Sequence, residues 1–202
     1  MDIFSLLDQI QAVARNGLYY SDNGYDSERY KRILNLSAEQ YSELLDTSST
    51  EIKQNFLAET GQITPKVGAD AAIFDEAGRI LLMERVDGTG WCLPCGWVEA
   101  GEKPCQAAIR ETKEETGLDV TISRLVGVFT RLPHQHGGLH TMIAVVHLCE
   151  IVGGSLELSH EGTRLKYCEI DAIDNWHATH EEYARAAHKM WQADGILPSV
   201  SN

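Results

Sequence analysis

The stretch from Gly96 to Leu118 constrains this 202-residue chain more than any other part of it. Its second half predicts a helix, because Pro104 suits a first helical position and Gly117 suits the left-handed residue just past a helix end. One side of that helix collects residues that can pack on a core. These residues are Cys105, Ala108, Ile109, Thr112 and Thr116.

The neighbouring side of the same helix concentrates carboxylates. Glu111, Glu114 and Glu115 fall within an arc of about 100°. Like charges at this spacing cost roughly a few tenths of a kcal/mol per pair, and a divalent cation removes the conflict. Hard ions such as Mg²⁺ and Mn²⁺ prefer oxygen ligands, so we interpret this face as a metal site that substrate phosphates complete. The alternative is an ordinary solvated charged face.

The whole pattern adds a family resemblance. Its fixed positions, with gaps of five and seven residues after the first and second, are Gly96, Glu102, Arg110, Glu111, Glu114, Glu115 and Gly117. They resemble the Nudix box, the signature of hydrolases that act on nucleoside diphosphates linked to another moiety. Two positions depart from the pattern, since Thr112 stands at a hydrophobic position and Cys95 stands where the family usually has a second glycine.

The resemblance implies a fold, a cofactor and a set of site residues. The fold is a Nudix-type α/β/α sandwich, and the cofactor is Mg²⁺ or Mn²⁺. The implied metal ligands are Glu111, Glu114, Glu115 and the backbone carbonyl of Cys95. Glu114 and Arg110 also count among the catalytic residues, and Arg110 pairs with Glu102 to orient the loop against the helix, as in the family.

Two further features carry catalytic or substrate-binding alternatives. Family members take the general base from the box or from a later loop, and Glu161 is the candidate on a later loop here, with a loop carboxylate without a role as the alternative. His134, His136 and His140 lie where several relatives line the phosphate or the leaving group. They could stabilise charge there, or belong to a solvated loop.

Cys92 and Cys95 form a Cys-x-x-Cys pair just before the box. Such a pair is found in redox sites and as half of a zinc site. No second pair with suitable spacing completes a tetrahedron in the sequence, so we favour a structural role. Chelation together with the histidines of the 134–140 loop is a minor alternative.

Composition and charge exclude some classes of partner. The formal net charge of −13 argues against broad binding to nucleic acid or an anionic membrane, because both need basic patches. The first residues lack a basic, signal-like start, and no run of about 18 apolar residues follows, so we expect a cytoplasmic protein. Five cysteines without scaffold spacing fit a reducing compartment.

The first 61 residues predict a small, all-helical N-terminal domain. Helices are expected over residues 3–15, with a stop at Asn16-Gly17, over 26–45 with Asp26 as N-cap, and from a Ser48/Glu51 capping box to Gly61. Through Gln-Ala-Val-Ala-Arg-Asn-Gly-Leu-Tyr-Tyr at residues 11–20 and Tyr-Asp-Ser-Glu-Arg-Tyr at residues 25–30, the segment resembles the helical N-terminal domain of a subgroup of bacterial Nudix hydrolases for ADP-ribose and CDP-choline type substrates. So small a core favours docking on the main domain or on a second subunit, and we expect a homodimer.

The remaining chain predicts a linker and one larger domain. Residues 62–66 form the linker, and residues 67–202 form the hydrolase domain. Strands are expected over residues 67–74 and 79–85, which imply a hairpin, and over 119–131, 139–151 and 165–170. A Thr179/Glu182 capping box predicts a last helix that ends near Trp191.

These features together predict an enzyme. The expected reaction is metal-dependent hydrolysis of the pyrophosphate bond of a nucleoside diphosphate derivative, of ADP-ribose or CDP-choline type, which gives a nucleoside monophosphate and a second phosphorylated product. Hydrolysis at RNA ends is an alternative that the acidic charge disfavours. A non-catalytic sensor of the same ligands is the alternative from a different class.

Overall fold

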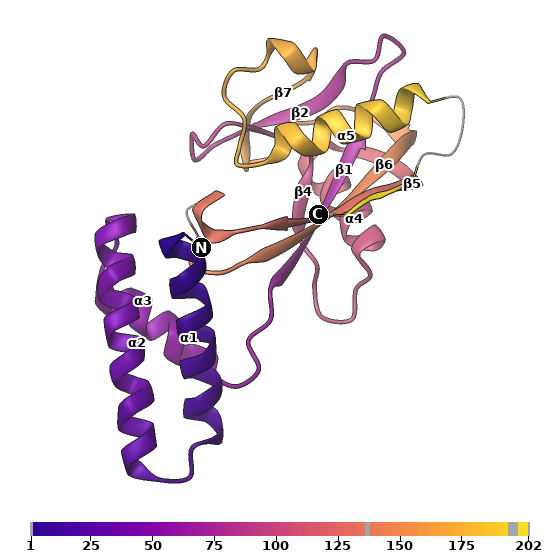
Figure 1. The fold of residues 1–202 in the computed structure, drawn as a ribbon. Helices are drawn as coiled ribbons and strands as arrows, with labels where there is room; N and C mark the ends of the chain where they lie inside the picture. The colour runs from indigo at the N-terminus through magenta and orange to yellow at the C-terminus, as the bar shows by residue number, and fades with distance from the viewer. Residues whose placement is uncertain (1, 136–137, 194–197, 202) are drawn as a thin grey trace. The chain divides into compact units, whose positions relative to one another are not determined.

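The structure, a computed structural model, describes residues 2–135, 138–193 and 198–201. Its contacts divide the chain into two compact units. We call Met1–Pro65 with Leu132–Thr141 the helical unit, and Lys66–Arg131 with Met142–Asn202 the sheet unit. Figure 1 shows both, and each is described by itself.

The described residues of the helical unit form α1 (Ile3–Tyr20), α2 (Gly24–Leu45) and α3 (Ser49–Ala58). An apolar core joins the three helices through Leu7, Ala14, Leu34, Ala38, Tyr41, Ile52 and Phe56. The predicted stop of the first helix at Asn16-Gly17 is wrong, because α1 continues to Tyr20. A Cβ at position 17 would overlap the ring of Tyr30, so Gly17 serves close packing against α2 instead of helix termination.

The starts of α2 and α3 also differ from prediction. The side chain of Asn23, not Asp26, caps α2 by accepting the backbone N–H of Asp26 at 2.9 Å. Ser48 is the N-cap residue of α3, but its side chain makes no capping hydrogen bond, so the predicted capping box does not form. That helix ends at Ala58, before the predicted end at Gly61.

The segment Leu132–Thr141 joins the helical unit through polar contacts, and it contains the short 3-10 helix η1 (Pro133–Gln135). Thr141 donates its backbone N–H at 2.9 Å and its hydroxyl at 2.6 Å to Asp8 of α1. The hydroxyl of Tyr41 donates to the carbonyl oxygen of Leu139 at 3.1 Å. A loop between two strands of the sheet unit is thereby held by α1 and α2.

The sheet unit contains two sheets among its described strands. The five-stranded sheet has the order β4-β1-β6-β5-β8, and the three-stranded sheet has the order β3-β2-β7. The strands are β1 (Lys66–Ile73), β2 (Ile80–Arg85), β3 (Trp91–Cys92), β4 (Cys95–Trp97), β5 (Leu118–Arg131), β6 (Met142–Gly154), β7 (Gly162–Cys168) and β8 (Val200–Ser201). The predicted hairpin of the first two strands is wrong, because β1 and β2 lie in different sheets and, within the described part of the chain, a single bridge, Phe74–Ile80, links them.

Two helices cover the larger sheet on opposite faces (Figure 1). Helix α4 (Pro104–Thr116) packs on β1 and β5 over Ala69, Ala71 and Ile73. Helix α5 (His180–Gln192) packs on the other face, where Tyr183, Ala184 and Ala187 meet the side chains of β5 and β6. This arrangement confirms the predicted α/β/α sandwich and the helical N-terminal region.

The termini of α4 and α5 can be compared with the helix ends predicted from the sequence. Pro104 opens α4, and Gly117 closes it with a φ of 74°, so that prediction is confirmed. Thr179 makes no capping hydrogen bond to α5, so the predicted capping box is wrong; its hydroxyl donates to the hydroxyl of Tyr183 at 2.8 Å. Among the described helices, none has the length and hydropathy that crossing a membrane requires.

Candidate functional site

The orientation of α4 decides which of its carboxylates are buried. Its buried residues are Ala107, Ala108, Thr112, Glu115 and Thr116, whereas Ile109 is 36% exposed. The packing side is therefore rotated from the predicted one, which included Cys105 and Ile109. The departure at Thr112 is accommodated, because its hydroxyl donates to the carbonyl oxygen of Ala108 at 2.7 Å and the residue is fully buried.

Glu115 is the buried member of the carboxylate cluster, with 2% exposure. Its Oε2 accepts the backbone N–H of Cys95 at 2.9 Å. Burial, followed by the influence of Cys92, raises the pKa of this carboxyl to about 9. Within the described part of the chain, no basic side chain forms an ion pair with it. In the metal-free protein, Glu115 therefore holds a proton at neutral pH.

Glu111 lies beside the loop that precedes α4, and Gly96 makes room for it. A Cβ at position 96 would overlap the carboxylate of Glu111, so a larger residue there would displace this carboxylate. Burial raises the pKa of Glu111 as well, although an ion pair with Arg110 at 2.8 Å opposes that shift. The fixed glycine of the motif is therefore a space requirement of the cluster.

Arg110 binds the loop and the cluster at once. Its Nε and Nη2 donate to the two carboxylate oxygens of Glu102 at 3.0 Å each, and Nη2 also donates to the carbonyl oxygen of Trp97 at 3.1 Å. Its Nη1 reaches Glu111, and lies 3.3 Å from Glu114. This geometry gives Arg110 a positioning role, because its guanidinium joins the Trp97 loop to the carboxylates of α4.

The backbone N–H and carbonyl of Cys95 point to the open edge of strand β4, whereas its side chain lies on one face of the sheet. Asp70 and Cys95 are paired across β1 and β4, and flanking hydrogen bonds join Ala71 N–H to the Pro94 carbonyl and Val98 N–H to the Val67 carbonyl. In an antiparallel ladder, this alternation leaves the peptide groups of Cys95 facing the open edge of β4. Its N–H reaches Glu115 there, and its carbonyl faces the same edge.

The missing second glycine of the motif does not strain the loop. Among the described residues, the non-glycine residues with positive φ are Asp46 and Ala178. Cys95 is not one of them, so the loop accepts a side chain at this position.

Glu114 and Glu161 are the exposed members of the predicted site. The side chain of Glu114 is 59% exposed. Glu161 begins the turn into β7, and its charge raises the pKa of both Glu111 and Glu115. The structure therefore brings Glu161 into electrostatic range of the cluster.

The predicted histidines are placed differently. His140 belongs to the helical unit, where its Nδ1 lies 3.3 Å from Gln11 Nε2 and its ring lies 6.2 Å from that of Phe56. His136 lies outside the described residues, and so does the side chain of His134. A substrate-binding role for the three stays a prediction.

The sequence analysis missed three buried polar residues on the α5 face of the sheet. They are Asp70, Arg131 and His180, with exposures of 3%, 6% and 1%. Asp70 could have been found from the sequence, because it is the one charged residue in the apolar run 67–74. No local pattern singles out His180 or Arg131, since only the fold brings β1, β5 and α5 together.

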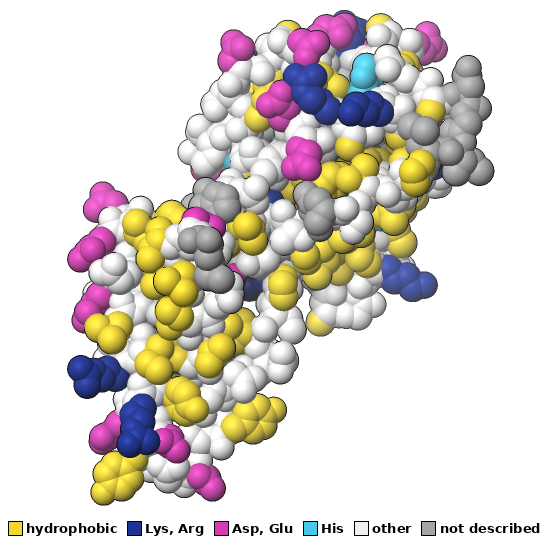
Figure 2. Space-filling view, viewed as in Figure 1, with side chains coloured by type: hydrophobic (Ala, Val, Ile, Leu, Met, Phe, Trp, Pro, Cys, Tyr) yellow, Lys and Arg dark blue, Asp and Glu magenta, His cyan; other side chains and the backbone are white. Residues whose placement is uncertain are grey.

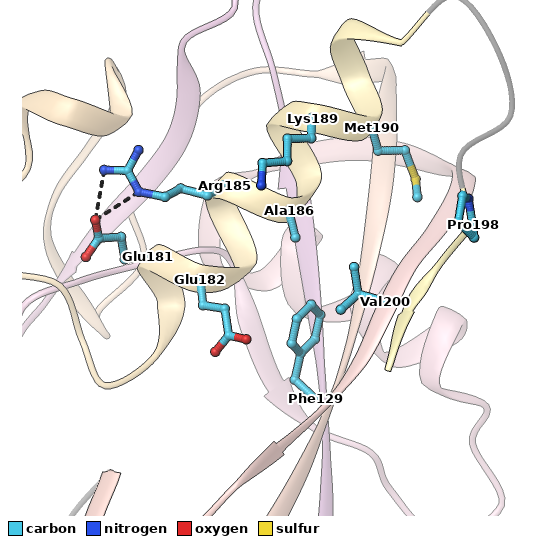
Figure 3. Close-up of a pocket in the computed structure, with 9 residues that line it drawn as sticks. All are labelled: Phe129, Glu181, Glu182, Arg185, Ala186, Lys189, Met190, Pro198 and Val200. Carbon is cyan, nitrogen blue, oxygen red and sulfur yellow. Dashed lines mark hydrogen bonds and ion pairs between the residues drawn. The ribbon is translucent and has the colours of Figure 1, made fainter. Parts of the chain in front are cut away.

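A groove of about 690 Å³ lies between α5 and the strands β5 and β8 (Figure 3). Phe129, Met190 and Val200 form its apolar part, and the ion pair of Arg185 with Glu181 borders it. None of its lining residues belongs to the carboxylate cluster, so we do not assign the site to this groove.

The carboxylate cluster fits a hard divalent cation by its own chemistry. It offers oxygen donors from adjacent turns of one helix, and the Cys95 carbonyl faces the same edge. Its most buried carboxyl has a raised pKa and lacks a basic ion-pair partner among the described residues. An added cation would supply the missing positive charge.

Comparisons with known proteins give the family of this chain. A family model described as NUDIX domain matches residues 64–194, and one described as UDP-X-like, N-terminal oligomerisation domain matches residues 1–56. The chain belongs to the Nudix hydrolase family.

Named relatives lie within the same family. The chain is 36% identical over 128 residues to the putative ADP-ribose pyrophosphatase YjhB of Bacillus subtilis, which covers 63% of this chain and 61% of that protein. It is 28% identical over 155 residues to the ADP-ribose pyrophosphatase of Methanocaldococcus jannaschii, covering 74% and 85%. The match therefore spans less than two thirds of the first of these relatives.

Solved structures share the fold. An ADP-ribose pyrophosphatase from Streptococcus suis matches with a TM-score of 0.55 and 28% identity, covering 65% of this chain and 96% of that one. A UDP-X diphosphatase matches 93% of this chain and 92% of its own, with a TM-score of 0.58 and 24% identity. The match to the UDP-X diphosphatase extends over both units, but at 24% identity it supports only a shared fold.

The raised pKa of Glu115 predicts a pH dependence of stability. The folded-state pKa of about 9 exceeds the unfolded value of 4.5, so the folded protein holds a proton that the unfolded chain releases. Stability of the metal-free protein should fall as pH rises between these values, by at most about 1.4 kcal/mol per unit from this group. Urea unfolding after chelation, at a series of pH values, measures the slope.

Glu115→Gln should flatten that slope, because glutamine keeps a carbonyl oxygen for the Cys95 N–H and does not titrate. Glu114→Gln, at an exposed position of the same helix, is the matched control and should leave the slope almost unchanged. Equal slopes for wild type and Glu115→Gln would show that Glu115 is already ionised in the folded protein.

Proposed function

We propose that this protein hydrolyses the pyrophosphate linkage of a nucleoside diphosphate derivative, with Mg²⁺ or Mn²⁺ as cofactor. The observation that carries the proposal is the buried carboxyl of Glu115, which lacks a basic ion-pair partner among the described residues and stands one turn from Glu111. A carboxyl in this state is costly to ionise unless a cation binds beside it. The proposed ligands are Glu111, Glu114, Glu115 and the carbonyl of Cys95.

The chemistry is attack of water on a phosphorus atom of the P–O–P linkage. A bound divalent cation lowers the pKa of a coordinated water and neutralises phosphate charge. The residues of the chain hold the ligand oxygens in place, since Arg110 ties Glu111 to the loop and the Cys95 N–H orients Glu115. Glu102 completes that support by binding Arg110 through two oxygens.

Glu161 is the proposed general base. It lies on a loop outside α4, it is exposed, and its negative charge acts on Glu111 and Glu115. An exposed carboxylate near the cluster can accept the proton of the attacking water without giving up a place among the metal ligands. Glu114 is the alternative base within the motif.

ADP-ribose is the first substrate to test. The relatives from Bacillus subtilis and Methanocaldococcus jannaschii are named for ADP-ribose, and a CDP-alcohol such as CDP-choline is the second choice. Hydrolysis at RNA ends remains the weaker alternative, because the net charge of −13 repels a polyanion.

The activity test is product release from a nucleotide panel with and without Mg²⁺ or Mn²⁺. We expect a nucleoside monophosphate to form from ADP-ribose only with metal present. Glu115→Gln should lower kcat/KM by on the order of 10²-fold or more, because even indirect partners of a metal are worth about 10–100-fold. Glu161→Gln should lower kcat by roughly 10²–10⁴-fold, as removal of a general base does, and leave metal affinity unchanged.

Glu150→Gln is the matched control, since Glu150 is an exposed glutamate of β6 outside the cluster. A folded protein that binds ADP-ribose but releases nothing across the panel would replace the hydrolase by a ligand sensor. Normal turnover of Glu115→Gln would refute the assignment of the metal site.

We also propose that the helical domain joins two copies of this chain, with residues 1–61 as that domain and 67–202 as the hydrolase domain. Figure 2 shows apolar side chains gathered on the visible face of the helical unit. Within the helical unit, Val13, Tyr20 and Leu36 are 68%, 69% and 55% exposed, which is costly for a monomer. The family model that matches residues 1–56 is described as an oligomerisation domain, and this agrees with a homodimer.

Light scattering on the eluting protein measures its mass directly. We expect wild type at twice the chain mass and Val13→Glu shifted toward a single chain, because a charge would be buried at the interface. Gln54→Glu, at an exposed polar position of α3, is the control and should stay dimeric. A wild-type mass of one chain at micromolar concentration would contradict the homodimer.

A further inference from the structure

A second group of metal-ligating side chains lies on the α5 face of the larger sheet, apart from the carboxylates of α4. Asp70, Cys95 and His180 each place one ligand atom within 4.8 Å of the others. They come from β1, β4 and the first turn of α5. Asp70 and Cys95 are cross-strand partners, so their side chains stand on the same face of the sheet.

Cys92 lies beside Cys95, although its sulfur is not within 4.8 Å of all three of these ligand atoms. A hydrogen bond with Cys92, followed by burial, raises the pKa of the Cys95 thiol. The Cys92 thiol donates in turn to the carbonyl oxygen of Met83 at 3.6 Å. Cys95 of the Cys-x-x-Cys pair therefore meets Asp70 and His180 only in the fold, because these residues are distant along the chain.

We propose that Asp70, Cys95 and His180 bind one Zn²⁺ ion and that Cys92, whose thiol would turn away from the Met83 carbonyl, supplies the fourth ligand. Two thiolates, one imidazole and one carboxylate form a donor set that zinc favours and that Mg²⁺ does not. The Zn²⁺ ion displaces the two thiol protons, and the proton of Asp70 where that group is protonated, to solvent.

The imidazole of His180 is held in the form that a metal needs. The backbone N–H of Leu93 donates to its Nδ1 at 3.2 Å, so this nitrogen carries no proton. The same Nδ1 lies 3.5 Å from Asp70 Oδ1, and it therefore faces the group. Zinc would take the place of the Leu93 N–H at that lone pair.

The charges of the surroundings balance such a site. Zinc with two thiolates and one carboxylate carries a net charge of −1. Arg131, which is 6% exposed and acts electrostatically on both Asp70 and His180, supplies the opposite charge. Its Nε has no hydrogen-bond partner among the described residues, so this buried cation has donor capacity left for an anionic complex.

The site would fix the strand that supports the carboxylate cluster. The Cys92–Cys95 segment crosses from the three-stranded sheet to the five-stranded sheet, and zinc would tie it to β1 and α5. The N–H of Cys95 orients Glu115 from the same residue. We assign zinc a structural role, and the site stands whether or not the chain is a hydrolase.

Cobalt(II) absorption tests the proposal on the reduced, metal-stripped, full-length protein. One equivalent of Co²⁺ should give a thiolate-to-cobalt charge-transfer band together with the intense visible bands of a tetrahedral site, and one equivalent of Zn²⁺ should remove them. Cys95→Ser should abolish the charge-transfer band or displace it. Cys105→Ser, which changes a cysteine outside the group, and the Glu111→Gln/Glu115→Gln double variant should keep it.

A second measurement uses only the wild-type protein, so it tests the zinc site even if the Cys95→Ser variant fails to fold. Zinc should slow alkylation of Cys92 and Cys95 by N-ethylmaleimide, read by peptide mass spectrometry, while Cys105 reacts at an unchanged rate. Absence of the cobalt band in the folded wild type, or zinc without effect on both thiols, would overturn the proposal. A disulfide between Cys92 and Cys95 in protein purified under reducing conditions would also overturn it.

Discussion

The hydrogen bond from the Cys95 backbone to the buried carboxyl of Glu115 is the interaction on which the site depends. It joins the edge strand β4 to the helix α4, at 2.9 Å, where α4 packs against the sheet. Because Glu115 is nearly inaccessible, its negative charge is poorly solvated, and burial raises its pKa. The fold thus builds a carboxyl that would ionise when a cation binds beside it, as the proposed metal site requires.

The other residues of the motif keep the loop and helix α4 in the positions that this hydrogen bond needs. Arg110 holds the loop by the Trp97 carbonyl and by Glu102, so the carboxylates keep their positions despite their mutual repulsion. Gly96 leaves space for Glu111. The spacing of the motif therefore follows from one small structure. In it, hydrogen bonds join the loop to helix α4 before any ligand binds.

The sequence predicted the local features of this structure and missed the long-range ones. Pro104 and Gly117 marked the ends of α4 because helix termini follow local backbone rules. The same local rules wrongly predicted a helix end at Gly17, because its role is set by Tyr30 of another helix. The placement of β1 and β2 in separate sheets could not be seen, because a turn between two strands does not specify their other partners. Asp70 and His180 meet only in the fold, and therefore the Cys-x-x-Cys pair seemed incomplete.

The central claim is that Glu115 is protonated in the metal-free protein and gives up its proton to a metal ion. Calorimetric titration of Mn²⁺ at about pH 7, in buffers of different ionisation enthalpy, measures the protons released per ion bound. To isolate the carboxylate cluster, the titration is made with the zinc-loaded protein. Our account predicts about one proton per ion in wild type and none in Glu115→Gln. Binding of Mn²⁺ without proton release, or no difference between the two proteins, would contradict it.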